Sequence, residues 1–451
     1  MKVTSNIEEL SDRLDGQDDM KEKKDIDVSL FDMIMSLSDA MDLISTVVNG
    51  HHKRVAYIAS SIAEELEMSK EEQRHLVIAG ALHDVGAFSL QERLDALNFE
   101  VTDFLESLGL SKHAEVGYRL INHFQPFDKI ASLIRYHHVY WQEGAGAEFQ
   151  SERIPLGSHI LHLSDRIDVS INMKEEVLSQ TDRINKRIKE NTGNQFKPEL
   201  VEVYLNLSDK ESFWFDIISP VTMEILAEEF SGINISLSID ELGDLAELFS
   251  QIIDFRSRFT ASHSSGVAAT AQALGGQIGL SKIDRKKIKI AGYLHDLGKL
   301  AVPTEILEKE EKLTDEEFNI IKKHVYHTYH TLKGVSGLEE INTWAAFHHE
   351  RLDGNGYPFH HQKEELSLGS RIMAVADVFT AITENRPYRE GMDKDRALEV
   401  LQDMVQDSAL DSDVVTVLAD NYEEINIIRQ TAQREETEEY KRFLQEVNGS
   451  Y

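Results

Sequence analysis

The sequence contains no cysteine among its 451 residues. Disulfide bonds and thiolate metal ligands are therefore excluded, and a reducing compartment is the natural setting for such a chain. Any metal bound by this protein has to be held by imidazole and carboxylate groups. The absence of cysteine directs attention to histidine, aspartate and glutamate.

Long apolar runs and basic residues are also scarce. The N-terminus has no apolar core of a signal peptide, and no run approaches the roughly 18 apolar residues that a membrane-spanning helix needs. Lys and Arg total 47 against 80 Asp and Glu, and the formal charge of −33 disfavours binding to polymeric DNA or RNA. We expect a cytoplasmic protein without a membrane partner. A small anionic substrate remains compatible with the local field of bound metal ions.

Proline is the third scarce residue, with only 7 in the chain. Because proline in a helix interior removes a backbone hydrogen bond, its scarcity permits long uninterrupted helices. From about Ser29 onward, apolar residues recur at helical rather than alternating spacing. The sequence therefore predicts an all-α fold.

A set of seven potential metal ligands occurs twice, in the same order and at nearly the same spacing. His263 follows His51 by 212 residues, and His324 follows His113 by 211. The first set is His51, His83, Asp84, His113, His137, His138 and Asp165, and the second is His263, His295, Asp296, His324, His348, His349 and Asp377. Such agreement indicates an internal duplication in which each copy has the side chains for a two-metal site.

The duplication also sets the expected domain boundaries. Residues before the first copy are charged and weakly periodic, which predicts a flexible arm. Residues after the second copy carry mixed charges, which predicts a solvent-exposed helix. The expected segments are an arm at 1–27, a first domain at 28–222, a linker at 223–235, a second domain at 236–430 and a charged C-terminal helix at 431–451.

The adjacent His-Asp pairs favour a binuclear centre, because imidazole offers one lone pair whereas a carboxylate can bridge two ions. In a helix expected over 370–383, Asp377 points away from the apolar stripe and toward small residues, so its charge needs compensation. Metal ligation provides that compensation, and a salt bridge or helix cap is the alternative. Gly298 is expected to end the helix that precedes His295 and Asp296.

A glycine-rich loop follows His348 and His349. It reads Asp353-Gly354-Asn355-Gly356-Tyr357-Pro358, in which the glycines permit positive φ and the proline fixes φ. We expect this loop to fold back tightly over a pocket, and an ordinary structural turn is the alternative.

With these motifs the second copy resembles the HD-GYP phosphodiesterases, a branch of the HD phosphohydrolase superfamily. The match runs from His263 through His295-Asp296-Leu297-Gly298-Lys299 and the Gly-Tyr-Pro loop to Arg386-Pro387-Tyr388-Arg389. The resemblance implies tandem HD-domain helical bundles with a di-iron or di-manganese centre. It also implies hydrolysis of a cyclic dinucleotide to a linear one, most commonly cyclic di-GMP and in some members 3',3'-cyclic GMP-AMP.

The resemblance implies a role for each matching residue. One metal ion would be held by His263, His295 and Asp377, and the other by His324, His348 and His349, with Asp296 bridging the two and a hydroxide between them as nucleophile. Lys299 would lie against the scissile phosphate. Tyr357, Arg386 and Arg389 would contact the substrate, since arginine grips phosphate and an aromatic ring stacks on a base. Outside the family pattern, these four would be a solvated lysine and packing or surface residues.

Some positions depart from the family pattern. Phe259 stands where some members have a glutamate that binds a third metal, so a binuclear site is favoured, and Thr328 replaces the usual glycine after His324. The first copy has Ala87 where the second has Lys299, and it lacks both the Gly-Tyr-Pro loop and the Arg-Pro-Tyr-Arg motif. We expect the first copy to be a degenerate domain with a regulatory or structural role.

Two other functions remain as alternatives. A nucleotide phosphohydrolase acting on a terminal phosphate is one, and the Gly-Tyr-Pro loop argues against it. A non-catalytic adaptor that binds the messenger or a diguanylate cyclase is the other, and Lys299 with the complete second ligand set argues against it. The sequence leaves open the choice between the two cyclic dinucleotides, the metal and the oligomeric state.

Overall fold

The computed structural model describes residues 26–43, 50–87, 111–230, 235–257, 261–309, 311–385 and 390–449. Within these ranges nearly all regular structure is helical, and the strands are two-residue pairs. The all-α prediction is therefore confirmed. The predicted arm at 1–27 lies outside the described residues except for Ile26 and Asp27. No helix in the described ranges is both long enough and apolar enough to cross a membrane.

The helices that carry the candidate ligands occur in the same order in the two copies. The first copy contains α2 (Leu30–Asp42), α3 (His51–Glu65), α4 (Lys70–Leu82), α6 (Lys112–Ile121), η2 (Gln125–Phe127), α7 (Asp128–Arg135), η3 (Gln142–Ala147), β2 (Glu148–Phe149), β3 (Glu152–Arg153), α8 (Leu156–Val169), η4 (Leu178–Gln180), α9 (Thr181–Glu190), α10 (Pro198–Ser208), α11 (Glu211–Ile218) and α12 (Thr222–Phe230). The second contains α13 (Ile239–Asp254), α14 (His263–Ile278), α15 (Lys282–Leu294), η6 (Leu297–Ala301), α16 (Thr304–Leu307), α17 (Asp315–Lys333), α18 (Glu339–Ala346), η7 (Lys363–Glu365), α19 (Leu368–Thr383), α20 (Lys394–Gln406), α21 (Ser412–Asp420) and α22 (Tyr422–Gly449).

Polar residues fix where several of these helices begin. Ser69, Ser238 and Thr314 each accept a hydrogen bond from the backbone N–H of a glutamate three residues on, whose side chain accepts from the backbone N–H of the cap. This reciprocal pair satisfies two N–H groups at each helix start. Because α4 and α17 lead to or carry candidate ligands, the caps help to fix the register of those ligands.

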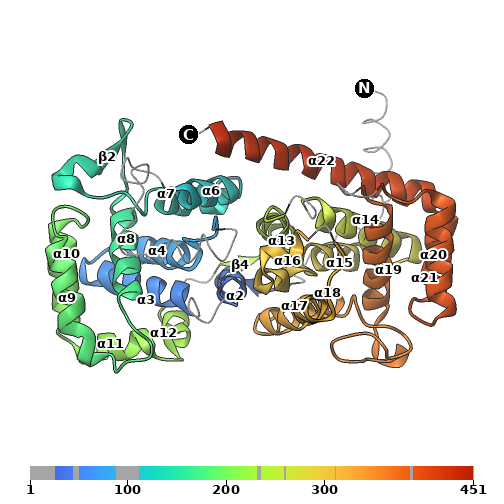
Figure 1. Ribbon diagram of the computed structural model, residues 1–451, viewed down its shortest axis with the longest axis horizontal. Helices are drawn as coiled ribbons and strands as arrows, with labels where there is room; N and C mark the ends of the chain where they lie inside the picture. Colours follow the sequence, from blue (N-terminus) through green and yellow to red (C-terminus); the bar gives the residue numbers. More distant parts are fainter. Residues whose placement is uncertain are drawn as a thin grey trace, which may run out of the picture.

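The two copies lie side by side, the first on the left and the second on the right in Figure 1. Helix α2 of the first copy packs against α17 and η6 of the second. The strands β1 (Val28–Ser29) and β4 (Ser236–Leu237) pair antiparallel, and buried side chains of both copies form one apolar cluster. The copies are therefore joined by packing as well as by the chain.

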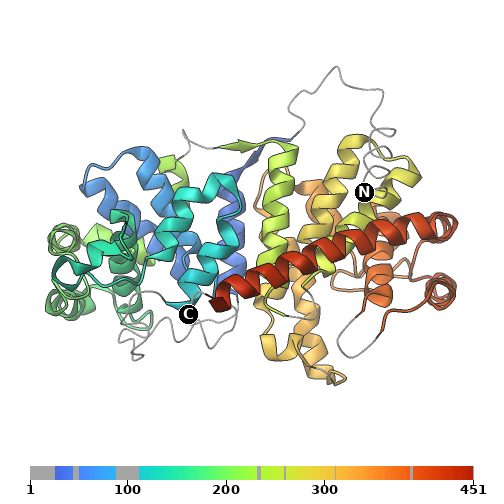
Figure 2. The ribbon, with the colours of Figure 1, turned by 90° about the horizontal axis from the view of Figure 1, so that it is seen from above.

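The C-terminal helix α22 runs along the second copy and reaches α6 of the first, as Figure 2 shows. The prediction of a solvated helix at 431–451 is wrong for one face, because Gln433, Glu436, Phe443 and Val447 are buried. Phe443 packs on Phe255, with ring centroids 5.4 Å apart. Most charged residues of the helix lie on its other faces, so the few buried positions do not form a recognisable apolar pattern in the sequence.

Glu436 on this buried face gives a test of the packing. Its carboxylate accepts a hydrogen bond of 2.8 Å from the Ser265 hydroxyl, and burial raises the pKa of Glu436 from 4.5 to about 8. Folded protein therefore holds a proton that unfolded protein releases, and stability falls as the pH rises from about 4.5 to about 8.

We expect Glu436→Gln to remove this pH-dependent loss of stability. Urea unfolding at pH 6 and pH 9 should show that the variant gains stability over the wild type at pH 9 relative to pH 6. The exposed neighbour Glu435, changed to Gln, is the control and should leave the pH dependence unaltered. An identical pH dependence for wild type and Glu436→Gln would contradict the buried, protonated carboxyl.

Candidate metal centre

The fold brings the seven candidate ligands of the second copy together from five segments. His263 begins α14, His295 and Asp296 follow α15, and His324 lies in the middle of α17. The remaining three, His348, His349 and Asp377, follow α18 or lie within α19.

Backbone carbonyls orient three of these imidazoles in the same way. The Nδ1 atoms of His295, His324 and His348 lie 2.7, 2.6 and 2.7 Å from carbonyl oxygens three residues earlier in the chain. Because a carbonyl can only accept, Nδ1 carries the proton in each ring. The lone pair of Nε2 is therefore left to face the centre, as metal-binding histidines require.

Asp296 lies between two groups of histidines. Its Oδ2 is 3.2 Å from Nε2 of His295, and its Oδ1 is 3.3 Å from Nε2 of His324. The potential ligand atoms of His263, His295 and Asp296 lie within 4.8 Å of one another, as do those of His324, His348 and His349. One carboxylate thus faces both groups.

Asp377 closes the same centre from α19. Its Oδ1 is 3.2 Å from Nε2 of His263 and 4.0 Å from Nε2 of His295, and its Oδ2 is 3.8 Å from Nδ1 of His349. The carboxylate is buried and points toward the histidines. Its counter-groups are therefore the candidate ligands themselves.

The protonation states suit a cation. Burial lowers the pKa of His324 to about 3 and holds that of His348 well below its usual value. Burial alone would raise the pKa of Asp296, but His295 and Lys299 outweigh it and hold that pKa well below the usual range. The centre therefore combines the neutral imidazoles of His324 and His348 with the ionised carboxylate of Asp296.

His263 differs from the other imidazoles. Burial lowers its pKa, but the carboxylates of Glu384 and Asp377 outweigh burial and raise the pKa to about 10. A bound cation would replace the proton that His263 holds in the free protein.

The residues fit a metal because hydrogen-bond acceptors, the imidazole Nε2 atoms and the oxygens of Asp296, face one another. Nε2 of His295 is buried and makes no hydrogen bond within the described part of the chain, although an oxygen of Asp296 lies 3.2 Å away. Nε2 of His324 likewise faces Asp296 at 3.3 Å and Nε2 of His348 at 3.5 Å. Lone pairs that converge in this way repel unless cations lie between them.

Lys299 also reaches the centre. It lies in η6, and its Nζ forms an ion pair with Asp296 while 17% of the side chain stays exposed. Burial lowers the pKa of Lys299, but Asp296 outweighs it and raises that pKa, so the amine is charged. A fixed positive charge therefore stands directly beside the central carboxylate.

Gly298 does not end a helix in the manner expected. Helix α15 ends at Leu294, and Gly298 lies within η6 with a negative φ. A Cβ at position 298 would lie 1.9 Å from the carbonyl oxygen of His324, so glycine is needed for close packing. Thr328, which stands where the family usually has glycine, makes two hydrogen bonds to this turn. Its hydroxyl accepts from the N–H of Gly298 at 2.9 Å and donates to the carbonyl of His295 at 3.1 Å.

The Gly-Tyr-Pro loop folds back as predicted. The N–H of Tyr357 donates to the carbonyl of His349 at 3.2 Å, and the two rings lie 4.9 Å apart. The buried carboxylate of Glu350 accepts from the N–H groups of Phe359 at 2.7 Å and His361 at 3.0 Å. Sequence reasoning did not assign this clamp to Glu350, because its partners are backbone groups 9 and 11 residues away.

Three positions singled out in the sequence lie outside the described residues. They are Phe259, Arg386 and Arg389.

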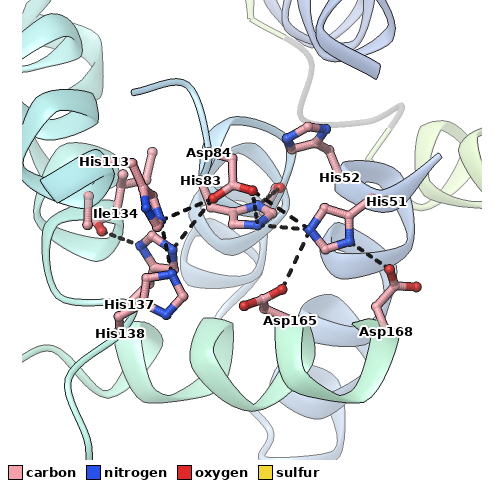
Figure 3. A network of polar contacts seen from close by, with 12 residues as sticks. His51, His52, His83, Asp84, His113, Ile134, His137, His138, Asp165 and Asp168 are labelled. Carbon is pink, nitrogen blue, oxygen red and sulfur yellow. Dashed lines mark hydrogen bonds and ion pairs between the residues drawn. The ribbon is translucent and has the colours of Figure 1, made fainter. Parts of the chain in front are cut away.

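The first copy repeats the arrangement around Asp84, as Figure 3 shows. Oδ1 of Asp84 is 3.3 Å from Nε2 of His113 and 4.0 Å from that of His137, and Oδ2 is 3.6 Å from that of His83. Asp84 belongs both to a group with His51 and His83 and to a group with His113, His137 and His138. Nε2 of His137 and Oδ1 of Asp84 are buried without a hydrogen bond in the described residues. The donor set of the first copy thus fits cations as well.

Cationic side chains distinguish the copies. In the first copy Oδ1 of Asp165 lies 3.5 Å from Nε2 of His51, but Oδ2 accepts from Nε of the buried Arg166 at 3.0 Å. Ala87 provides no amine where Lys299 stands in the second copy. The cation at the first centre is therefore paired with Asp165, whereas Lys299 of the second copy is paired with the central Asp296.

Comparison with known proteins places the chain in a class. Residues 48–170 and 247–414 each match a family model described as the HD domain. The fold and the two His/Asp centres define a tandem HD-domain protein of the metal-dependent phosphohydrolase class.

Individual relatives show which family of HD-domain phosphohydrolases the chain belongs to. The chain is 31% identical over 408 residues to the 3'3'-cGAMP-specific phosphodiesterase 1 of Vibrio cholerae serotype O1, covering 87% of this chain and 92% of the relative. A shorter stretch is 41% identical over 143 residues to a cyclic di-GMP phosphodiesterase of Pseudomonas aeruginosa, covering 31% and 34% of the two chains. The chain therefore belongs to the HD-GYP family of cyclic dinucleotide phosphodiesterases.

A solved structure shares the fold. The crystal structure of the V. cholerae cyclic GMP-AMP specific phosphodiesterase V-cGAP3 matches with a TM-score of 0.61 and 24% identity, covering 88% of this chain and 98% of that one. The tandem arrangement is thus common to both proteins.

Proposed function

We propose that the second copy hydrolyses a phosphodiester bond of 3',3'-cyclic GMP-AMP and releases a linear dinucleotide. The observation that carries this function is the convergence of imidazole and carboxylate atoms on either side of Asp296, next to the charged Lys299. 3',3'-Cyclic GMP-AMP is favoured because the relative that covers nearly the whole chain is specific for it. Cyclic di-GMP is the second candidate, supported by the shorter match.

The ligand assignment of the proposal follows the two histidine groups. His263, His295 and Asp377 would hold one divalent ion and His324, His348 and His349 the other, and Asp296 would offer an oxygen to each group. Imidazole and carboxylate donors suit iron or manganese. When bound, two such ions lower the pKa of water and stabilise negative charge on the reacting phosphoryl oxygens.

The remaining residues bind and orient the substrate. Lys299 offers its charge to the scissile phosphate, and the ring of Tyr357, held by the folded-back loop, offers a face to a base. Burial raises the pKa of Tyr357, so its hydroxyl stays protonated. Arg386 and Arg389 contribute phosphate contacts by the family pattern.

Product analysis tests the function. Protein purified without oxygen and loaded with Mn²⁺ or Fe²⁺ is incubated separately with 3',3'-cyclic GMP-AMP and cyclic di-GMP, and the products are separated by chromatography. A linear dinucleotide is expected, formed faster from 3',3'-cyclic GMP-AMP. Release of inorganic phosphate from nucleotides instead would identify a nucleotide phosphohydrolase. Cyclic dinucleotide binding without turnover by the wild type would identify an adaptor.

The first copy, residues 28–222, has a regulatory or structural role in this proposal. It keeps the ligands around Asp84 but not a counterpart of Lys299. Replacing His83 and Asp84 with alanine should therefore leave substantial phosphodiesterase activity in soluble protein. A loss as complete as that caused by changing His295 and Asp296 would refute this division of labour.

A further inference from the structure

His263 is oriented by a side chain, whereas backbone carbonyls orient His295, His324 and His348. Nδ1 of His263 does not bond to a carbonyl of its own helix as those of His295, His324 and His348 do; it donates to Oε2 of Glu384 at 3.1 Å. Glu384 lies just past the end of α19 and is only 6% exposed. A buried carboxylate thus sets the orientation of His263.

The C-terminal helix holds that carboxylate. Nε2 of Gln433 in α22 donates to Oε2 of Glu384 at 3.0 Å, and Oε1 of Gln433 accepts from Arg429. Arg429 is 2% exposed and also donates to the carbonyl of Thr383 at 3.4 Å. These contacts form a buried chain from α22 through Glu384 to His263.

The space for Gln433 is provided by a glycine. A Cβ at Gly266, one turn after His263 in α14, would lie 2.8 Å from Cδ of Gln433. Any larger side chain at this position would push Gln433 away from Glu384. Helix α22 can therefore approach α14 closely because Gly266 of α14 leaves room for Gln433 of α22.

The first copy orients the matching histidine with different residues. Nδ1 of His51 donates to Oδ2 of Asp168 at 2.7 Å, and Nη2 of Arg54 donates to the same oxygen at 3.1 Å. Positions 54 and 168 lie three residues after His51 and Asp165, and the second copy has Gly266 and Thr380 at the corresponding positions. The second copy thus has Glu384 and the side chains of α22 where the first copy has Asp168 and Arg54.

We infer that Glu384 is a positioning residue for His263, and that Gln433 and Arg429 make helix α22 a working part of the second metal centre. A carboxylate that accepts from Nδ1–H fixes the tautomer, aims the Nε2 lone pair and makes it more basic toward a cation. The inference rests on the proposed function, because it assigns His263 to a metal.

Metal binding by three full-length variants tests the inference. Glu384→Gln keeps the volume but loses the charge, and Gln433→Ala removes the contact from α22. Gln430→Ala, on an exposed position of the same helix, is the matched control. Metal-free protein is titrated with Mn²⁺ and the bound ion is measured by electron paramagnetic resonance, with the unfolding temperature of each metal-free variant recorded alongside.

Glu384→Gln and Gln433→Ala should weaken, by about 10- to 100-fold, the Mn²⁺ binding that Asp296→Ala abolishes, which is the usual effect of removing a group that supports a metal ligand. Both changes remove buried contacts, so the unfolding temperatures should lie below that of Gln430→Ala, and added Mn²⁺ should restore the hydrolysis rates of the folded variants. A merely structural role would lower the unfolding temperature without changing the affinity of the folded protein for Mn²⁺.

Wild-type Mn²⁺ affinity in Glu384→Gln would overturn the inference, provided that Asp296→Ala loses binding in the same assay. The Glu384→Gln result decides the question even where Gln433→Ala fails to fold. Failure of the proposed function is a separate result, because wild-type protein that hydrolyses no cyclic dinucleotide still reports its Mn²⁺ affinity.

Discussion

Asp296→Ala should reduce hydrolysis of the cyclic dinucleotide to background and release metal from the second copy. The two oxygens of Asp296 lie 3.2 and 3.3 Å from Nε2 atoms of imidazoles in different groups, whereas Oδ2 of Asp377 lies 3.8 Å from the second group. Its loss leaves the facing imidazoles without their shared anion. We expect a fall in rate of at least about 10³-fold, beyond the 10- to 100-fold typical of groups that only support a ligand.

Metal content measured by mass spectrometry, together with the rate, checks this result. The matched control is Asp84→Ala, which removes the equivalent carboxylate from the first copy and should spare most of the activity. Substantial hydrolysis by folded Asp296→Ala would place the reaction elsewhere in the molecule.

Lys299→Met should produce the second largest effect. The amine is held beside Asp296 and is charged, so it can meet a phosphate that enters the centre. Methionine keeps most of the length and removes the charge. We expect kcat to fall by about 10²- to 10³-fold, as when a single stabilising donor is removed from an anionic transition state.

The expected division between kcat and KM separates this role from simple binding. Steady-state kinetics should show the loss mainly in kcat, whereas a lysine that only attracts substrate would raise KM. Lys312→Met, at an exposed position of the second copy, is the control and should be neutral. A Lys299→Met enzyme with wild-type kcat would contradict the assignment.

The candidate ligands could be predicted because a duplicated chain repeats them at a nearly fixed offset. His263, Asp296 and Asp377 could be paired with residues of the first copy by counting alone, and the structure brings them together. Tyr357 was identified from the motif of its loop, and this loop folds back so that the N–H of Tyr357 donates to the carbonyl of His349.

Other parts of the site could not be predicted. Gly298 was expected to end a helix, but its role is to let η6 approach α17, and Thr328 then bonds to the same turn. Neither role can be recognised without knowing that the two segments touch. The C-terminal helix was expected to be solvated, and its buried face became visible only through its packing against α14 and against Phe255, the residue that follows α13.

The order of residues alone was enough to establish a helical protein with two related halves, one of them keeping the lysine and the loop of its family. These properties depend on the spacing and composition of residues, which the linear sequence contains in full. Only the folded chain decided how His263 is held, because Gln433 and Glu384 are 49 residues apart and their contact follows no period. A helix that carries mostly charged residues can therefore complete a buried centre, since a few side chains on one face determine what it touches.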